Sequence, residues 1–318
     1  MIGMPGKSYR GDLPPADERL ISLAEELRQD VSRLAVEIGE RNLRNRPHEL
    51  AKAADRIETE FKVPGLVTER QEYEVSGTKC CNLEAEIQGV RRPEEIIIVG
   101  AHYDTVPGTP GANDNTSGVA ATLALARRFA PRRIGRTLRF VAFVNEEKPY
   151  AHTEQMGSRV YARRCRKRRE YVVGMMSLET IGYYDDRPGS QKYPPPFGLF
   201  YPSEGNFIAF VGNLASRRLV RQAVAAFRQG EPFPSEGAAV PEMVPRVRDS
   251  DHASFWREGF PAIMVTDTAN FRYPYYHTPE DTIDKLDFDR MARVVRGLEK
   301  VVAELVTATP GWDHRIGS

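Results

Sequence analysis

The chain has 318 residues, of which 41% are hydrophobic and 28% are charged, and these proportions are typical of a globular protein. Because 45 basic residues are balanced by 44 acidic ones, no net charge favours nucleic acid or a membrane surface as a partner. The three cysteines, Cys80, Cys81 and Cys165, are too few for a disulfide framework or a cysteine zinc site, so we expect reduced thiols.

No stretch reaches the ~18 apolar residues of a membrane-spanning helix. Residues 1–15, MIGMPGKSYRGDLPP, lack the apolar segment of a signal peptide. We therefore expect a cytoplasmic protein, or an exported one if a native leader precedes this start.

Secondary structure is predicted from the spacing of apolar residues after an irregular leader at 1–16. Helical spacing covers 17–38, and a second helix begins at Pro47. From residue 66 onwards strands alternate with helices, which predicts a largely parallel sheet covered on both faces. No linker divides the chain, so we expect a single domain over 1–318. The expected strands are 66–75, 82–87, 96–100, 138–144, 172–178, 207–211 and 262–266, and the later helices are 117–129, 157–166, 214–227 and 288–306.

Two long segments, 185–206 and 230–250, are rich in proline, glycine and aromatic residues. Long irregular loops in a compact domain often form the rim or lid of a functional site. We expect both to be loop insertions near the site, and a plain surface insertion is the alternative.

Imidazole and carboxylate groups follow four of the predicted strands. Ligands of α/β sheets bind beyond the carboxyl ends of strands, so these groups indicate a metal site at one edge. In strand order they are His102, Asp104 and Asp114, then Glu146 and Glu147, then Glu179, and finally Tyr276 and His277.

The spacing of His102 and Asp104 places both on the same side of a strand end. Asp104 can then accept a hydrogen bond from the imidazole nitrogen that faces away from a metal. A histidine satisfied within the core is the alternative. Asp114 lies in a Gly/Asn turn before a helix, where it can bridge two cations as in two-zinc hydrolases, although the turn also suits helix capping.

Seven segments occur in an order that resembles the zinc-dependent M28 peptidases, which include leucyl and broad-specificity aminopeptidases and to which animal glutaminyl cyclases are similar. The resemblance covers roughly residues 80–305. It implies a three-layer α/β/α sandwich with a mixed, mostly parallel sheet of about eight strands. The segments are GAHYDTV (100–106), GANDNTSG (111–118), VNEE (144–147), MGS (156–158), SLETIGYY (177–184), SDHASFW (250–256) and YYHTPEDT (275–282).

The same resemblance implies a role for each matching residue. His102 and Glu179 would hold one zinc ion, and Glu147 and His277 would hold a second. Asp114 would bridge the two ions, and Glu146 would be the general acid/base. Many members of the family have aspartate where this chain has Glu179. The implied activity is a two-zinc aminopeptidase acting on peptides with a free N-terminus.

Two other functions remain open at this point. A glutaminyl-peptide cyclotransferase would work with one zinc ion, and a non-catalytic M28-like binding domain would lack the base or a ligand. Tyr276 can donate a hydrogen bond to an oxyanion or simply pack at the rim. Asp251 and His252 are candidates for contacts with the ligands or the substrate, and the alternative is a helix start capped by Ser250.

Overall fold

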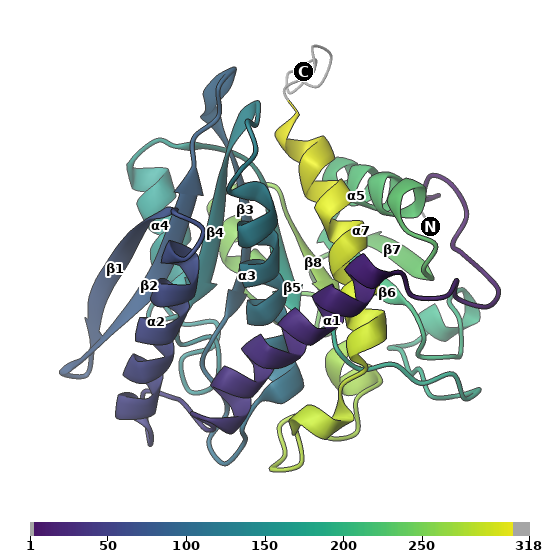
Figure 1. Ribbon diagram of the computed structural model, residues 1–318, viewed down its shortest axis with the longest axis horizontal. Helices are drawn as coiled ribbons and strands as arrows, with labels where there is room; N and C mark the ends of the chain where they lie inside the picture. The colour runs from purple at the N-terminus through teal and green to yellow at the C-terminus, as the bar shows by residue number, and fades with distance from the viewer. Residues whose placement is uncertain (1–2, 308–318) are drawn as a thin grey trace.

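One mixed sheet of eight strands runs through the computed structural model, which describes residues 3–307 (Figure 1). The four central strands are parallel, whereas the β1–β2 hairpin and β6 run antiparallel to their inner neighbours. The order is β1-β2-β4-β3-β5-β8-β6-β7. The strands are β1 Val67–Val75, β2 Thr78–Ile87, β3 Arg92–His102, β4 Arg136–Phe143, β5 Tyr171–Glu179, β6 Ile208–Asn213, β7 Ser235–Val240 and β8 Ala262–Thr266.

The long helices begin at residues suited to that position. The Asp17 carboxylate accepts a hydrogen bond from the Leu20 N–H at the start of α1, and Asp287 does the same for Arg290 in α7. Pro47 occupies the first turn of α2, where its missing N–H costs nothing. The helices are α1 Glu18–Val31, α2 Pro47–Lys62, α3 Gly118–Phe129, α4 Gly157–Lys167, α5 Arg217–Gly230, α6 His252–Arg257 and α7 Phe288–Val306.

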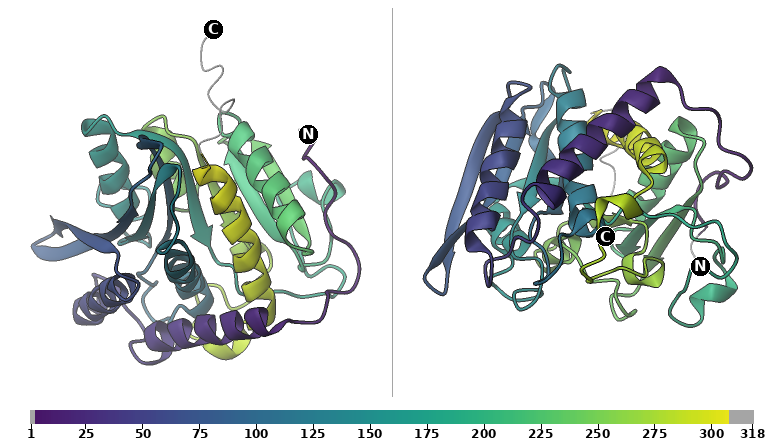
Figure 2. Two further views of the ribbon diagram at one scale, coloured as in Figure 1. Left: turned by 45° about the horizontal axis from the view of Figure 1, so that its top comes forward. Right: turned by 60° about the horizontal axis from the view of Figure 1, so that its bottom comes forward.

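Two hydrophobic cores lie on opposite faces of the sheet, because successive strand side chains point to opposite sides. In β3, Ile97 and Val99 pack with residues of α1, α2, α3, α5 and α7. Ile96 and Ile98 pack instead with residues of α4 and α6. Figure 2 shows α1, α7 and α5 on one side of the sheet. The expected three-layer α/β/α fold with a mixed sheet is confirmed.

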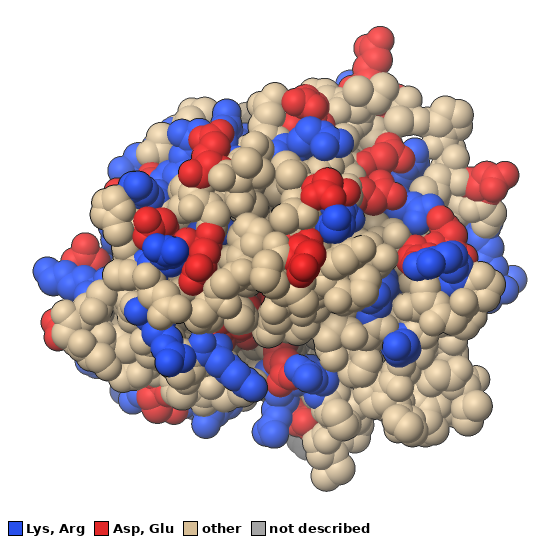
Figure 3. Space-filling view, turned by 90° about the horizontal axis from the view of Figure 1, so that it is seen from below, with Lys and Arg blue, Asp and Glu red and all other residues tan. Residues whose placement is uncertain are grey.

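The carboxyl ends of the four central strands meet at one edge of the sheet. The segment that follows β8 lies beyond this edge, at the bottom of Figure 1. Seen from below, Lys and Arg side chains are interspersed with Asp and Glu, so this face carries no large area of one charge (Figure 3). Among residues 3–307, no helix is long and apolar enough to cross a bilayer.

Several predicted boundaries differ from the structure. The expected helix over 17–38 leaves α-helical geometry after Val31 and continues as a π-helical turn, Ser32–Val36. The expectation that 230–250 is irregular is wrong for β7, which pairs with β6 over its whole length. The ends of the expected leader and domain, residues 1–2 and 308–318, lie outside the described residues.

The described part of the leader is held by specific hydrogen bonds. The Arg228 guanidinium donates to the carbonyl oxygens of Pro5 and Gly6, and the Ser8 hydroxyl oxygen accepts from the Ser235 N–H. Arg293 donates to the carbonyl oxygen of Pro14. The leader therefore follows the outer strand β7 and the helices α5 and α7 on its way to α1.

Candidate metal centre

Asp114 lies between His102, which closely precedes it in the chain, and His277, which is far along the chain. Its Oδ1 is 3.3 Å from Nε2 of His102, and its Oδ2 is 3.0 Å from Nε2 of His277. The two carboxylate oxygens thus face two different imidazoles. A carboxylate in this position can bridge two cations.

Each histidine also faces a second carboxylate. Glu179 Oε2 is 3.5 Å from His102 Nε2, and Glu147 Oε1 is 3.2 Å from His277 Nε2. The structure therefore brings the five residues expected as ligands into one cluster of two halves that share Asp114. The donor atoms of His102, Asp114 and Glu147 lie within 4.8 Å of one another.

The polar atoms at the centre of this cluster lack hydrogen-bond partners among the described residues. Nε2 of His102 and both oxygens of Asp114 are buried and unpaired. An unsatisfied buried polar group costs about 1–3 kcal/mol, so three that converge on one place indicate a cation-binding site. Imidazole nitrogens and carboxylate oxygens are ligands that suit zinc. The residues fit a zinc centre.

The pKa values of the buried carboxylates in the cluster also indicate a site for cations. Burial, with neighbouring carboxylates, raises the pKa of Glu146 well above its usual range. Burial also raises the pKa of Glu147 to about 7, in spite of His277. Burial opposes ionisation of Asp114 as well, but the nearby imidazoles of His102 and His277 hold its pKa below the usual value. Cations at this place would stabilise all three carboxylates in their charged form.

Glu146 and Glu147 diverge after the end of β4. The Glu147 carboxylate faces His277, whereas Oε2 of Glu146 lies 3.9 Å from His102 Nε2. Both backbone N–H groups donate to the two oxygens of the Asp104 carboxylate, each at 3.1 Å. Asp104 therefore fixes the backbone from which the two glutamates project.

This use of Asp104 changes the expected contact with His102. The Asp104 carboxylate lies 3.6 Å from Nδ1 of His102, beyond hydrogen-bond distance, while the Asp104 backbone carbonyl oxygen lies 3.2 Å from the same nitrogen. The expectation that the carboxylate accepts from the imidazole is wrong in this detail, because the backbone carbonyl oxygen is the nearer acceptor. The imidazole is still oriented from behind, by the carbonyl oxygen.

The turn that carries Asp114 is held by Asp281, which sequence reasoning missed. The Asp281 carboxylate accepts from the N–H groups of Asn113 and Asp114, at 2.8 and 3.0 Å, and from the Tyr273 hydroxyl at 2.8 Å. Gly111 begins this turn with φ 63°, which favours glycine. A signal for Asp281 existed, because it stands in YYHTPEDT, four residues after His277.

Arg41 is a second missed residue. Its guanidinium is fully buried and donates to the carbonyl oxygens of Tyr103 and Pro110, at 2.6 and 2.9 Å, and to the Thr116 hydroxyl at 2.5 Å. Arg41 therefore joins the segment directly after β3, the strand that ends at His102, to the turn that carries Asp114. Burial lowers the pKa of Arg41 to about 10, so it stays charged at neutral pH.

Comparison with known proteins assigns the family. The family model of Peptidase family M28 matches residues 82–302. This chain belongs to Peptidase family M28. It is 38% identical over 258 residues to the uncharacterized protein YfbL of Escherichia coli, with 78% of each chain covered.

Relatives named as aminopeptidases match this M28 chain more weakly. Identity is 27% to leucine aminopeptidase 1 of Arthroderma otae, covering 67% of this chain and 55% of that one. It is 25% to aminopeptidase YwaD of Bacillus subtilis, covering 64% and 41%. The chain thus spans about half the length of these two relatives.

Solved structures share the fold. The zinc aminopeptidase BSAP of Bacillus subtilis has a TM-score of 0.69 at 16% identity, covering 94% of this chain and 97% of that one. The glutaminyl cyclase of Fimbriiglobus ruber has a TM-score of 0.64 at 21% identity, covering 95% and 99%. At these identities the likeness establishes the fold alone, which both kinds of enzyme possess.

The remaining candidates of this M28 chain divide into two groups. Tyr276 stacks on the His277 ring with centroids 3.8 Å apart, and Asp251 is fully buried and interacts electrostatically with His102 and Glu179. Both therefore belong to the site. His252 does not, because its Nε2 contacts the Val247 carbonyl oxygen at 2.9 Å and its ring packs against Trp256.

Ser250 contacts a proposed ligand instead of capping a helix. Its hydroxyl donates to Oε2 of Glu179 at 2.6 Å, and α6 begins without a side-chain cap. The Ser177 and Ser250 hydroxyls are 2.8 Å apart. Ser250 therefore orients the longer arm of Glu179 towards His102.

Proposed function

We propose that this M28 chain is a two-zinc aminopeptidase that removes N-terminal residues from peptides. The observation that carries the proposal is Asp114 between two histidine–carboxylate pairs. His102 and Glu179 would hold one ion with Oδ1 of Asp114, and His277 and Glu147 would hold the other with Oδ2. Zinc at such a centre polarises the scissile carbonyl and lowers the pKa of bound water to about 7.

Glu146 is the proposed general base and acid. Its carboxylate lies beside the His102 half of the centre, where it can take up a proton and return it. Glu146 takes a proton from the attacking water and passes it to the leaving amine as the peptide C–N bond breaks. One water is consumed, and the products are a free amino acid and a shortened peptide.

The charge around Glu146 favours a free N-terminus. Glu146, Glu179 and Asp251 are close enough that each raises the pKa of another by repulsion. An N-terminal ammonium group brings the opposite charge to this place, whereas an internal peptide bond brings none. The proposed partner is therefore a peptide with an unblocked N-terminus.

A single-zinc glutaminyl-peptide cyclotransferase is the second candidate. The observation in its favour is Ser250, which donates to Oε2 of Glu179, the same oxygen that approaches His102 most closely. If this hydrogen bond draws the oxygen away from a cation, the His277 half alone would hold zinc.

One experiment separates these functions. Metal content would be measured, and zinc-loaded and chelated protein would be assayed on aminoacyl-p-nitroanilides and on peptides that begin with glutamine. We expect near two zinc ions per chain and amino acid release that chelation abolishes. One zinc ion with release of ammonia from glutaminyl peptides would establish the cyclase instead. Full zinc content without turnover on either class would leave a binding domain.

A further inference from the structure

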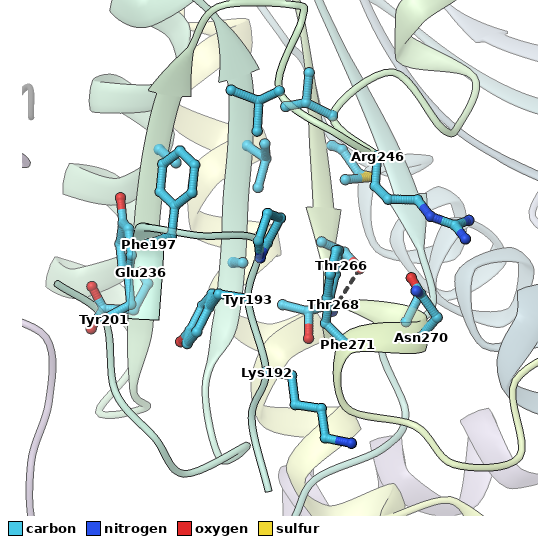
Figure 4. A pocket seen from close by; sticks show the side chains of 18 of the residues that line it. Lys192, Tyr193, Phe197, Tyr201, Glu236, Arg246, Thr266, Thr268, Asn270 and Phe271 are labelled. Atoms are coloured by element: carbon cyan, nitrogen blue, oxygen red, sulfur yellow. Dashed lines mark hydrogen bonds between the residues drawn. The ribbon is translucent and has the colours of Figure 1, made fainter. Parts of the chain in front are cut away.

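A pocket opens beside the proposed metal centre, over the face of β8, β6 and β7 that α5 and α7 do not cover (Figure 4). Its cavity measures about 150 Å³. Glu179 and Tyr276 both line it. The pocket is therefore continuous with the centre.

The floor of the pocket includes a row of residues that crosses four strands. Glu179 of β5 pairs with Thr266 of β8, Thr266 pairs with Ala209 of β6, and Ala209 pairs with Glu236 of β7. Residues paired in this way have side chains on the same face of a sheet. At ~4.8 Å per strand, the backbones of Glu179 and Glu236 are roughly 14 Å apart.

The space between the two glutamates suits an unbranched, partly apolar group. The side chains of Thr266, Ala209 and Ala238 are small, so they leave open space above the floor of the pocket. Tyr193 and Phe197, from the loop at 185–206, stand over it beside Tyr201 in Figure 4. Aromatic rings pack against methylene groups and attract cations through their faces.

Glu236 is placed at the far end, where its ion pair with Arg228 is long. The nearest guanidinium nitrogen, from Arg228, is 3.9 Å away, and that guanidinium donates to the Ser235, Pro5 and Gly6 carbonyl oxygens. Ser8 and Arg10 of the leader also act on the Glu236 carboxylate, but burial prevails and raises its pKa.

The other cations of the pocket lie at its mouth. Lys192 and Arg246 are exposed, and in Figure 4 their charged ends extend away from the aromatic side chains. Neither side chain points towards Glu236. The far end of the pocket therefore presents a carboxylate to whatever enters.

We propose that this pocket receives the side chain of the substrate's N-terminal residue and that Glu236 selects lysine or arginine there. The inference rests on the proposed aminopeptidase function. A lysine or arginine side chain carries its charge roughly 6–7 Å from Cα. With the Cα of the N-terminal residue over Thr266, roughly 5 Å along the row from Glu179, that charge comes within reach of the Glu236 side chain, whereas a leucine side chain ends near Ala209.

The test compares kcat/KM for lysyl-, arginyl-, leucyl- and norleucyl-p-nitroanilide. Norleucine has the length of lysine without the charge. We expect lysine to exceed norleucine by about tenfold or more, because a charged hydrogen bond at a desolvated site is worth at least that factor. In Glu236→Gln the two should become equal, through loss of lysine activity with norleucine activity retained. Glu204→Gln, a carboxylate of the adjacent loop that does not line the pocket, is the control and should keep the preference.

A binding measurement gives a readout apart from turnover. Calorimetric affinity for lysinamide over norleucinamide should fall in Glu236→Gln and persist in Glu204→Gln. If leucyl substrates are cleaved but lysine is not preferred, or if Glu236→Gln affects lysine and norleucine alike, the role of Glu236 is overturned while the aminopeptidase stands. If no aminoacyl substrate is cleaved by zinc-loaded protein, the proposed function itself fails.

Discussion

Glu146 and Glu147 are neighbours in the chain but face different histidines, and their backbone is fixed by one acceptor, Asp104. This arrangement separates two tasks that a single carboxylate cannot perform together. A metal ligand must stay charged, whereas a base must gain and lose a proton. The two amide variants should therefore fail in different ways.

Glu146→Gln keeps the size of the side chain but cannot accept a proton. Zinc content should stay at the wild-type value while turnover falls by roughly 10²–10⁴. Glu147→Gln removes a charged ligand, so zinc content and turnover should fall together, and added zinc should restore part of both. Metal analysis and turnover of the two purified variants check this prediction. Equal loss of zinc from both would contradict the division of roles.

His252 illustrates a buried histidine with a structural role. Its Nε2–H donates to the Val247 carbonyl oxygen, and Nδ1 has no partner among the described residues. Burial lowers the pKa of His252 to about 4, from 6.5 in an exposed histidine. The folded protein thus holds this ring neutral.

The lowered pKa predicts a loss of stability in acid. Above pH 6.5 the ring is neutral in both states, whereas between pH 6.5 and 4 only the unfolded chain takes up the proton. The free energy of unfolding should therefore fall by about 3 kcal/mol across this window because of His252. His252→Phe should remove that part of the slope. Urea unfolding of both proteins with chelator present, at several pH values, measures it, and parallel slopes would refute it.

At the residue level, the sequence predicted which side chains follow the strands, and the structure brings His102, Asp114 and Glu179 into one cluster. His102, Asp114 and Glu179 all follow predicted strands. The role of Arg41 could not be predicted, because the acceptors that tie it to the site, at Tyr103, Pro110 and Thr116, lie more than sixty residues further along the chain, and two of them are backbone carbonyls, which every residue has.

At the level of elements, the strands and helices with strong apolar periodicity were predicted closely, and β7 was not. Its sequence, SEGAAV, consists mainly of small residues with low β propensity. It forms a strand because it pairs with β6 over Ile208 to Asn213, a contact that local sequence does not encode. The helix α6 spans only His252–Arg257, which is too short for helical periodicity to be recognised.

The packing of α5 on α7 depends on Gly297. The fully buried ring of Phe227, from α5, lies where a side chain at Gly297 would be. The absence of a Cβ therefore allows the two helices to approach closely at this point. Helix propensity alone would favour alanine there by about 1 kcal/mol.

Gly297→Ala should be destabilising in spite of that propensity. The added methyl overlaps the Phe227 ring, and overpacking of a rigid core costs about 1–3 kcal/mol. Glu304→Ala, at an exposed position of α7, is the control and should change stability by less than about 0.5 kcal/mol. Thermal and urea unfolding of the two variants check this. A more stable Gly297→Ala protein would show that the helices can separate without cost.

At the scale of the whole molecule, the two ends of the described chain pack together. The helices α1 and α7 lie side by side (Figures 1 and 2), and Arg296 of α7 forms an ion pair with Asp17 at 2.9 Å. The core beneath them continues through α3 and α5, and the core on the other face uses alternate residues of the same strands. From this continuity we infer that the described residues fold as one domain.

A single domain predicts one unfolding transition. Far-ultraviolet circular dichroism is dominated by the helices of α1, α2, α3, α5 and α7 on one face of the sheet. Trp256 belongs to the core on the other face, so its fluorescence follows that face separately once the second tryptophan is removed by Trp312→Phe. Because β3 and β4 contribute side chains to both cores, neither face can lose its packing without removing support from the other. In urea the two signals should therefore have the same midpoint and slope in chelated protein. Saturating zinc should move both midpoints upwards together, because a ligand that binds the folded state stabilises that state as a whole. Transitions that separate, or zinc that moves only one of them, would show that the two faces unfold as independent units.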